Sequence, residues 1–192
     1  MVDVEKTASN IFTWIERNGL LLKQDSGPSV VSLLVGGAID GSWWAHPRAK
    51  DIFDVLQVLA HHPDILITKL IARKDTLVHR NLWSTILAVG IAREEWQLQR
   101  LPRLAAEMLL SIDQGGGLLA SGKHATELQR RLLVHGEQAM TTTGRHGVWL
   151  ESWTLWAERE GCQPSGTSTS GKRLLEQAVR ATYGEPLRLP WE

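Results

Sequence analysis

Cysteine is almost absent from this chain of 192 residues, in which Cys162 is the only one. A single cysteine cannot form a disulfide within the chain, and it cannot supply the several thiolates of a structural zinc site. Cys162 also has no evident base beside it in the sequence, so nothing indicates a catalytic thiol. This composition is typical of a protein of the reducing cytoplasm.

The chain also lacks a net charge, because 21 Lys and Arg residues balance 21 Asp and Glu residues. It therefore has no overall field that would attract a polyanion. Any affinity for nucleic acid must come from a local basic surface. The first sixty residues hold more acidic than basic side chains, whereas residues 69–80 and 123–146 are enriched in basic ones. We expect a basic surface in those two segments.

Long apolar runs and the common catalytic motifs are missing as well. No run approaches the roughly 20 residues that span a bilayer, and the N-terminus lacks the basic start and apolar segment of a signal peptide. The chain has no glycine-rich nucleotide or phosphate loop, no GxSxG turn and no HExxH helix, and the adjacent His61 and His62 lack the i, i+4 spacing of zinc ligands. We expect a soluble cytoplasmic protein without a cofactor or metal.

What the chain does contain is one pattern that occurs twice, an amphipathic helix followed by a basic pair of strands, over residues 47–80 and 122–150. The first hairpin is expected to turn at Lys74-Asp75, and the second at Thr143-Gly144. A helix followed by a basic hairpin is typical of winged-helix nucleic-acid-binding modules. The pattern predicts a mostly α fold with short β-hairpins, arranged as tandem winged-helix-like modules.

The same pattern divides the chain into three parts. We predict a first module over residues 1–95 and a second over residues 96–161. Residues 163–171 are small and polar, which indicates a flexible connector. A last helix, ended by Gly184, and a tail docked through Trp191 then complete the part from 162 to 192.

Basic side chains of the two hairpins are the candidate contacts to nucleic acid. With a two-residue turn, Lys69 would lie opposite Arg80, and a bridging phosphate would relieve the repulsion between these cations. The alternative is a solvated charged edge that protects the sheet from aggregation. The full set of candidates is Lys69, Arg73, Lys74, Arg80, Arg130, Arg131, Arg145 and His146.

An unusual segment before the helix of residues 47–60 holds two adjacent aromatic residues, Trp43 and Trp44. Such rings can stack on an unpaired base, or they can fill the core beneath a turn. Asp40 and His46, together with His79, are the candidates for proton transfer in a small hydrolase or lyase with a tryptophan-lined pocket. That enzyme is the first alternative to nucleic-acid binding.

A second alternative is a protein-interaction or dimerisation module. Trp149, Trp153 and Trp156 recur at helical spacing, which predicts a packed core or an interface more readily than a platform for bases. An exposed stripe of these three rings would support the interaction module and a homodimer. A buried stripe would support the core.

Residues 66–71 with 76–80, and residues 130–135 with 144–146, resemble the bacterial tandem winged-helix proteins that include the DNA glycosylases of interstrand-crosslink repair. These segments and their helices cover about half of the chain. The resemblance implies a DNA partner in repair or transcription, and a glycosylase-type hydrolase if the protein is an enzyme. The glutamine-x-glutamine catalytic pattern of that family is not found near the N-terminus. Gln97-Leu98-Gln99 has the same letters but falls in the linker between the modules, so the resemblance implies no catalytic residue.

Overall fold

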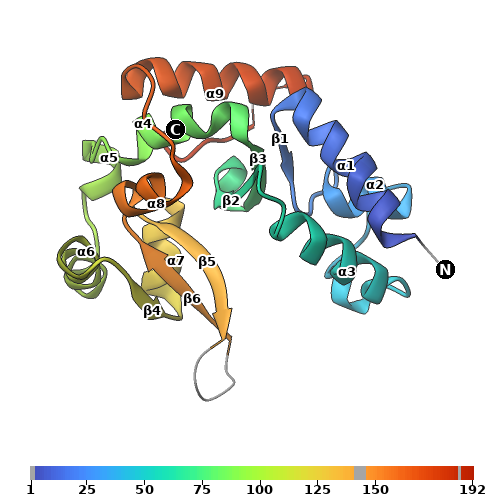
Figure 1. The fold of residues 1–192 in the computed structure, drawn as a ribbon, viewed down its shortest axis with the longest axis horizontal. Helices are drawn as coiled ribbons and strands as arrows, with labels where there is room; N and C mark the ends of the chain where they lie inside the picture. Colours follow the sequence, from blue (N-terminus) through green and yellow to red (C-terminus); the bar gives the residue numbers. More distant parts are fainter. Residues whose placement is uncertain (1–2, 141–145, 186) are drawn as a thin grey trace.

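The computed structural model describes residues 3–140, 146–185 and 187–192 and is mostly helical with two small antiparallel sheets (Figure 1). The prediction of a mostly α fold with short hairpins is confirmed. The first half contains α1 (Val4–Asn18), β1 (Leu20–Leu22), α2 (Val30–Val35), α3 (Ala49–Ala60), β2 (Ile65–Lys69) and β3 (Asp75–His79). The remainder contains α4 (Trp83–Gly90), α5 (Glu95–Leu98), α6 (Arg103–Gly115), β4 (Leu118–Ala120), α7 (Lys123–Arg130), β5 (His135–Met140), β6 (His146–Glu151), α8 (Trp153–Glu160) and α9 (Ser168–Tyr183).

Helices α1 and α3 follow directly from their apolar spacing and their end signals. The carboxylate of Asp3 accepts a hydrogen bond from the backbone N–H of Lys6 and so caps α1, which ends where Gly19 adopts a φ of 85°. Both helices bury the side that faces the first sheet and the opposite helix. The buried side chains are Ala8, Ile11 and Ile15 of α1 and Ile52, Val55, Leu56 and Leu59 of α3.

The first sheet has the strand order β1-β3-β2, with every pair antiparallel. Lys69 pairs with Asp75 rather than with Arg80, so the predicted register and the two-residue turn are wrong. Residues 70–74 form a longer connection because Leu70 and Ile71 are fully buried and turn the tip of the hairpin inward. At that tip, the backbone N–H of Ala72 donates to the carbonyl of Arg188 in the C-terminal tail at 2.7 Å. The first hairpin therefore does not project from the molecule.

The second sheet has the order β4-β6-β5 and is also antiparallel. Its hairpin, β5 and β6, extends away from the helices on the side of the molecule opposite α9 (Figure 1). The predicted turn at Thr143-Gly144 lies outside the described residues. Helix α7 ends at Arg130, three residues earlier than predicted, and Leu132 just beyond it has a φ of 50°.

Helix α9 joins the two halves of the fold, lying along α4 and reaching β1 and α1 (Figure 1). It begins at Ser168, within the segment predicted to be a flexible connector, because Thr167 and Ser170 form a reciprocal capping box. Lys172 donates to Glu94 at 2.7 Å, and this hydrogen bond lowers the pKa of Glu94. One buried cluster then collects side chains from the whole length of the chain, among them Leu20, Trp83, Trp153 and Leu175.

Candidate functional site

The segment before α3 presents a pair of stacked tryptophans. Ser42 accepts a hydrogen bond from the backbone N–H of Trp44 at the start of a short 3-10 turn. The two indole rings lie 3.9 Å apart between centroids with an angle of 25°. Trp43 is buried, with 7% of its surface exposed, whereas Trp44 is 64% exposed. The expectation that tryptophan fills the core here is met by Trp43, while Trp44 is left facing solvent.

The chain that follows this pair is fixed by hydrogen bonds. His46 accepts the backbone N–H of Arg48 at its Nδ1 atom, at 3.1 Å. The guanidinium of Arg48 donates to the carbonyl of Leu34 at 2.9 Å and forms an ion pair with Asp51 at 3.1 Å. These contacts attach the 3-10 turn to the end of α2 and the start of α3, so Trp44 has a rigid base.

The three candidates for proton transfer are not assembled into one site. Asp40 is exposed, and no hydrogen bond joins it to His46 in the described part of the chain. His79 lies on β3, where its ring centroid is 5.7 Å from that of Phe12 and its Nδ1 atom accepts the backbone N–H of Asn81. None of these three side chains lines the cavity between α4, α6 and α8 or the smaller one between α1 and α3.

Most cations of the first hairpin are held by carboxylates. Lys69 lies 2.7 Å from Asp75, and Arg80 lies 3.0 Å from Asp64. Lys74 pairs with Asp25; burial opposes ionisation of this carboxyl, but the hydrogen bond and charge of Lys74 and two backbone N–H groups outweigh it and lower its pKa. Arg73 is exposed at the tip, and no ion pair is found for it among the described side chains.

In the predicted second module, one basic candidate is held by hydrogen bonds within the protein and another is exposed. Arg131 bonds to Glu127 at 2.6 Å and to the carbonyls of Gln97 and Gln99 at 3.2 and 2.7 Å, so it anchors α7 to the linker. Arg130 is exposed, and the described residues provide it with no ion pair. Arg145 lies outside the described residues, and for His146 only the backbone, in β6, is described.

The three tryptophans near α8 do not form one exposed stripe. Trp153 and Trp156 are almost fully buried, and their rings meet edge to face at 5.6 Å, so the prediction that they pack in a core is confirmed. Trp149 lies on β6 instead, 40% exposed and seated on Gly117, where a Cβ atom would come within 2.2 Å of its ring. The interaction surface proposed for all three rings is therefore absent from this part of the described structure.

A buried polar cluster that the sequence did not reveal lies beside these rings. His135 and Glu151 face each other across β5 and β6, 6% and 3% exposed, with 3.1 Å between Nδ1 and Oε1. Arg159 of α8 bonds to the same carboxylate oxygen at 2.7 Å. Because the two strand positions are distant in sequence and no local motif joins them, only the register brings them together. The side chains of the cluster line neither the cavity between α4, α6 and α8 nor the one between α1 and α3.

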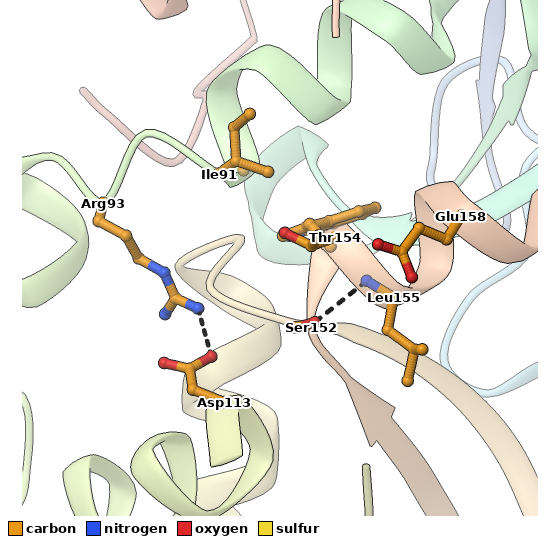
Figure 2. Close-up of a pocket in the computed structure, with 9 residues that line it drawn as sticks. Ile91, Arg93, Asp113, Ser152, Thr154, Leu155 and Glu158 are labelled. Atoms are coloured by element: carbon orange, nitrogen blue, oxygen red, sulfur yellow. Dashed lines mark hydrogen bonds and ion pairs between the residues drawn. The ribbon is translucent and has the colours of Figure 1, made fainter. Parts of the chain in front are cut away.

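A cavity with a volume of about 380 Å³ lies between the end of α4, α6 and the first turn of α8 (Figure 2). Arg93 reaches across it to Asp113 of α6, at 2.8 Å. The hydroxyl of Ser152 accepts the backbone N–H of Leu155 and so is engaged as the cap of α8. No histidine or cysteine lines this cavity, so it offers neither an imidazole base nor a thiol nucleophile.

Comparisons with known proteins do not extend this description, because no family model, no curated protein and no solved structure matches the chain. Within residues 3–140, 146–185 and 187–192, no helix is both long and apolar enough to cross a membrane. The same residues contain no group of three or more His, Cys, Asp or Glu side chains that could hold a metal ion.

Proposed function

We propose that this protein binds DNA through two winged-helix-like modules, with α3 as the contact helix of the first. The observation that carries the proposal is the connectivity of the first half. The order α1-β1-α2-α3-β2-β3 with the sheet order β1-β3-β2 is that expected of a winged helix, in which the helix before the hairpin enters a groove of DNA. Lys50, Phe53 and Gln57 lie on the exposed side of α3.

The second half supports the proposal with a reduced version of the same arrangement. It has the order α6-β4-α7-β5-β6 and the sheet order β4-β6-β5, with one helix in place of two between its first and second strands. Figure 1 shows the β5-β6 hairpin and α3 on the side of the molecule opposite α9. We propose that a single duplex contacts both elements.

Exposure and ion pairing indicate which basic residues can contact phosphate. Arg130 on α7 is exposed without an ion pair among the described residues, as is Lys123 at the start of the same helix. Lys74 and Arg80 keep 52% and 54% of their side chains exposed in their ion pairs. Exposed ion pairs contribute only about 0–1 kcal/mol, so a phosphate can replace the carboxylate at little cost. Arg131 is excluded as a phosphate contact because its guanidinium is occupied by the linker.

The proposal is tested by fluorescence anisotropy with a labelled DNA duplex over a range of salt concentrations. We expect log affinity to fall linearly with log salt. The double replacement Lys123→Ala with Arg130→Ala should reduce the slope by about 1 for each phosphate group that the variant can no longer neutralise. Arg103→Ala is the matched control, since Arg103 is an exposed helix arginine, 89% exposed, on α6.

The result that would overturn the proposal is equally direct. Absence of binding to duplex DNA at low salt, or binding whose strength does not change with salt, is incompatible with contacts to phosphate. The control removes one charge and the double variant removes two, so a decrease of the slope half as large in the control would show that the effect follows net charge rather than the surface of α7.

A further inference from the structure

Trp44 exposes an indole ring that is held in place without being covered. Its ring is stacked on Trp43 at 3.9 Å, and Trp43 is itself buried, yet Trp44 remains 64% exposed. A large aromatic ring fixed by its neighbours loses little conformational freedom when a partner binds. The exposed face of the Trp44 ring is therefore preorganised to stack on a planar group of a ligand.

A second ring borders the same surface. Phe53, one turn into α3, is 40% exposed, and its centroid lies 5.8 Å from that of Trp44 with an angle of 39° between the rings. The two rings come from different elements, the 3-10 turn and α3. Together they form an exposed aromatic corner at the N-terminal end of the helix assigned to the DNA groove.

Two cations close to this corner in sequence are paired with carboxylates. Arg48 pairs with Asp51 at 3.1 Å, and Lys50 pairs with Asp54 one turn later on α3. These cations add no net positive charge to the corner, so we expect the rings to supply most of the affinity for a nucleic acid bound here. Stacking of a base on an aromatic side chain needs no positive field and tolerates any base.

A fully paired duplex presents only the edges of its bases to a protein, whereas an unpaired base offers its face. We propose that Trp44 stacks on an unpaired base, so that the protein prefers DNA with a bulged or single-stranded nucleotide over fully paired DNA. This inference rests on the proposed function and adds to it the class of DNA that is preferred. Phe53 limits how far the stacked base can move along α3.

The experiment compares two labelled duplexes of identical sequence, one of which carries a single unpaired thymine at its centre. The wild-type protein should bind the bulged duplex about 5- to 150-fold more tightly, the range that corresponds to one base–aromatic stack. Trp44→Leu keeps an apolar side chain but removes the ring, so it should abolish this preference and leave the affinity for the paired duplex unchanged. Trp44→Phe should retain part of the preference.

Trp149→Leu is the matched control, because Trp149 is a second exposed tryptophan that lies on β6, outside the corner. It should keep the preference for the bulge. Equal affinity of the wild-type protein for both duplexes would overturn the inference while leaving the proposed function in place, and so would a preference that survives in Trp44→Leu. A loss of affinity for both duplexes in Trp44→Leu would make Trp44 a general contact and overturn base stacking. Failure of the wild-type protein to bind either duplex would overturn the proposed function itself.

Discussion

Gln97 and Trp153 donate hydrogen bonds to the same carbonyl oxygen, that of Leu132, at 3.2 and 2.8 Å. Gln97 is completely buried, and its amide also faces the carbonyls of Gly90 and Arg131. The linker between the two halves, which contains Gln97, and the start of α8, which contains Trp153, thus meet at the carbonyl of Leu132 just beyond α7. Leu132 has a φ of 50°, an uncommon conformation for leucine, and these two donors help to hold it there.

The first prediction concerns the stability that Gln97 provides. Gln97→Leu would remove the amide donor to the carbonyls of Gly90, Arg131 and Leu132, so we expect it to lower the free energy of unfolding by about 2–4 kcal/mol. Gln99→Leu is the control, because Gln99 is exposed two residues away and should change stability by less than about 0.5 kcal/mol. Urea denaturation measures both. Equal stability of the two variants would contradict the structural role of Gln97.

The second prediction concerns the contact between α4 and α9. A Cβ atom on Gly171 would lie 3.0 Å from a methyl group of Val89 and 3.1 Å from the carbonyl oxygen of Thr85. Gly171→Ala should therefore push α9 away from α4 and lower the free energy of unfolding by about 1–3 kcal/mol. Gly27→Ala has open space around it and should be close to neutral. A stabilising effect at position 171 in thermal denaturation would show that this contact is looser than described.

Tyr183 gives a prediction about alkaline pH. Burial raises the pKa of Tyr183 to about 12, although the backbone N–H of Leu22 donates to its hydroxyl and opposes the rise. In the unfolded chain tyrosine ionises near pH 10. Between about pH 10 and 12 the unfolded state therefore loses a proton that the folded state keeps, and stability falls as the pH rises.

The measurement for Tyr183 is the free energy of unfolding as a function of pH in the wild-type protein and in Tyr183→Phe. The variant lacks the acceptor for Leu22 and should be less stable at neutral pH. Its curve should then fall less steeply above about pH 10, because it has no hydroxyl to ionise at this position. Parallel curves over that range would contradict the raised pKa.

The stacked tryptophans give a prediction that separates packing from surface function. Trp43→Ala removes a buried ring and should cost about 3–5 kcal/mol of stability. Trp44→Ala removes an exposed ring and only one stacking contact, so it should cost about 0.5–1.5 kcal/mol. Circular dichroism with urea denaturation distinguishes the two, and equal losses would show that Trp44 belongs to the core. Because the expected loss of stability is small for replacements of Trp44, such variants should stay folded and can be used in binding experiments.

The sequence predicted those elements whose signals are local. The amphipathic helix before the first hairpin, which is α3, and the positions of both hairpins depend on neighbouring residues, and the structure contains each of them. Packing of Trp153 and Trp156 was also predicted, because their spacing places both on one side of a helix.

What the sequence could not predict depends on contacts between distant segments. The register of the first hairpin is set by burial of Leu70 and Ile71 against the C-terminal part of the chain, which local propensity does not contain. The carboxylates that pair with Lys74 and Arg80 come from Asp25 and Asp64, outside the hairpin. Likewise, residues 168–171 have the composition of a connector, and only the capping box and the close fit against α4 make them helical.

Because α9 lies near the C-terminal end of the sequence, its placement determines when the core can be completed during translation. Leu175 and Val179 complete a cluster whose other members include Leu20, Leu66 and Trp83, so those earlier side chains emerge from the ribosome long before their covering helix. Until α9 emerges, the nascent chain exposes the apolar surface that α4 will later share with it. Molecular chaperones bind exposed apolar surface of this kind. We expect chains truncated before α9 to keep this surface exposed and to stay bound to chaperones.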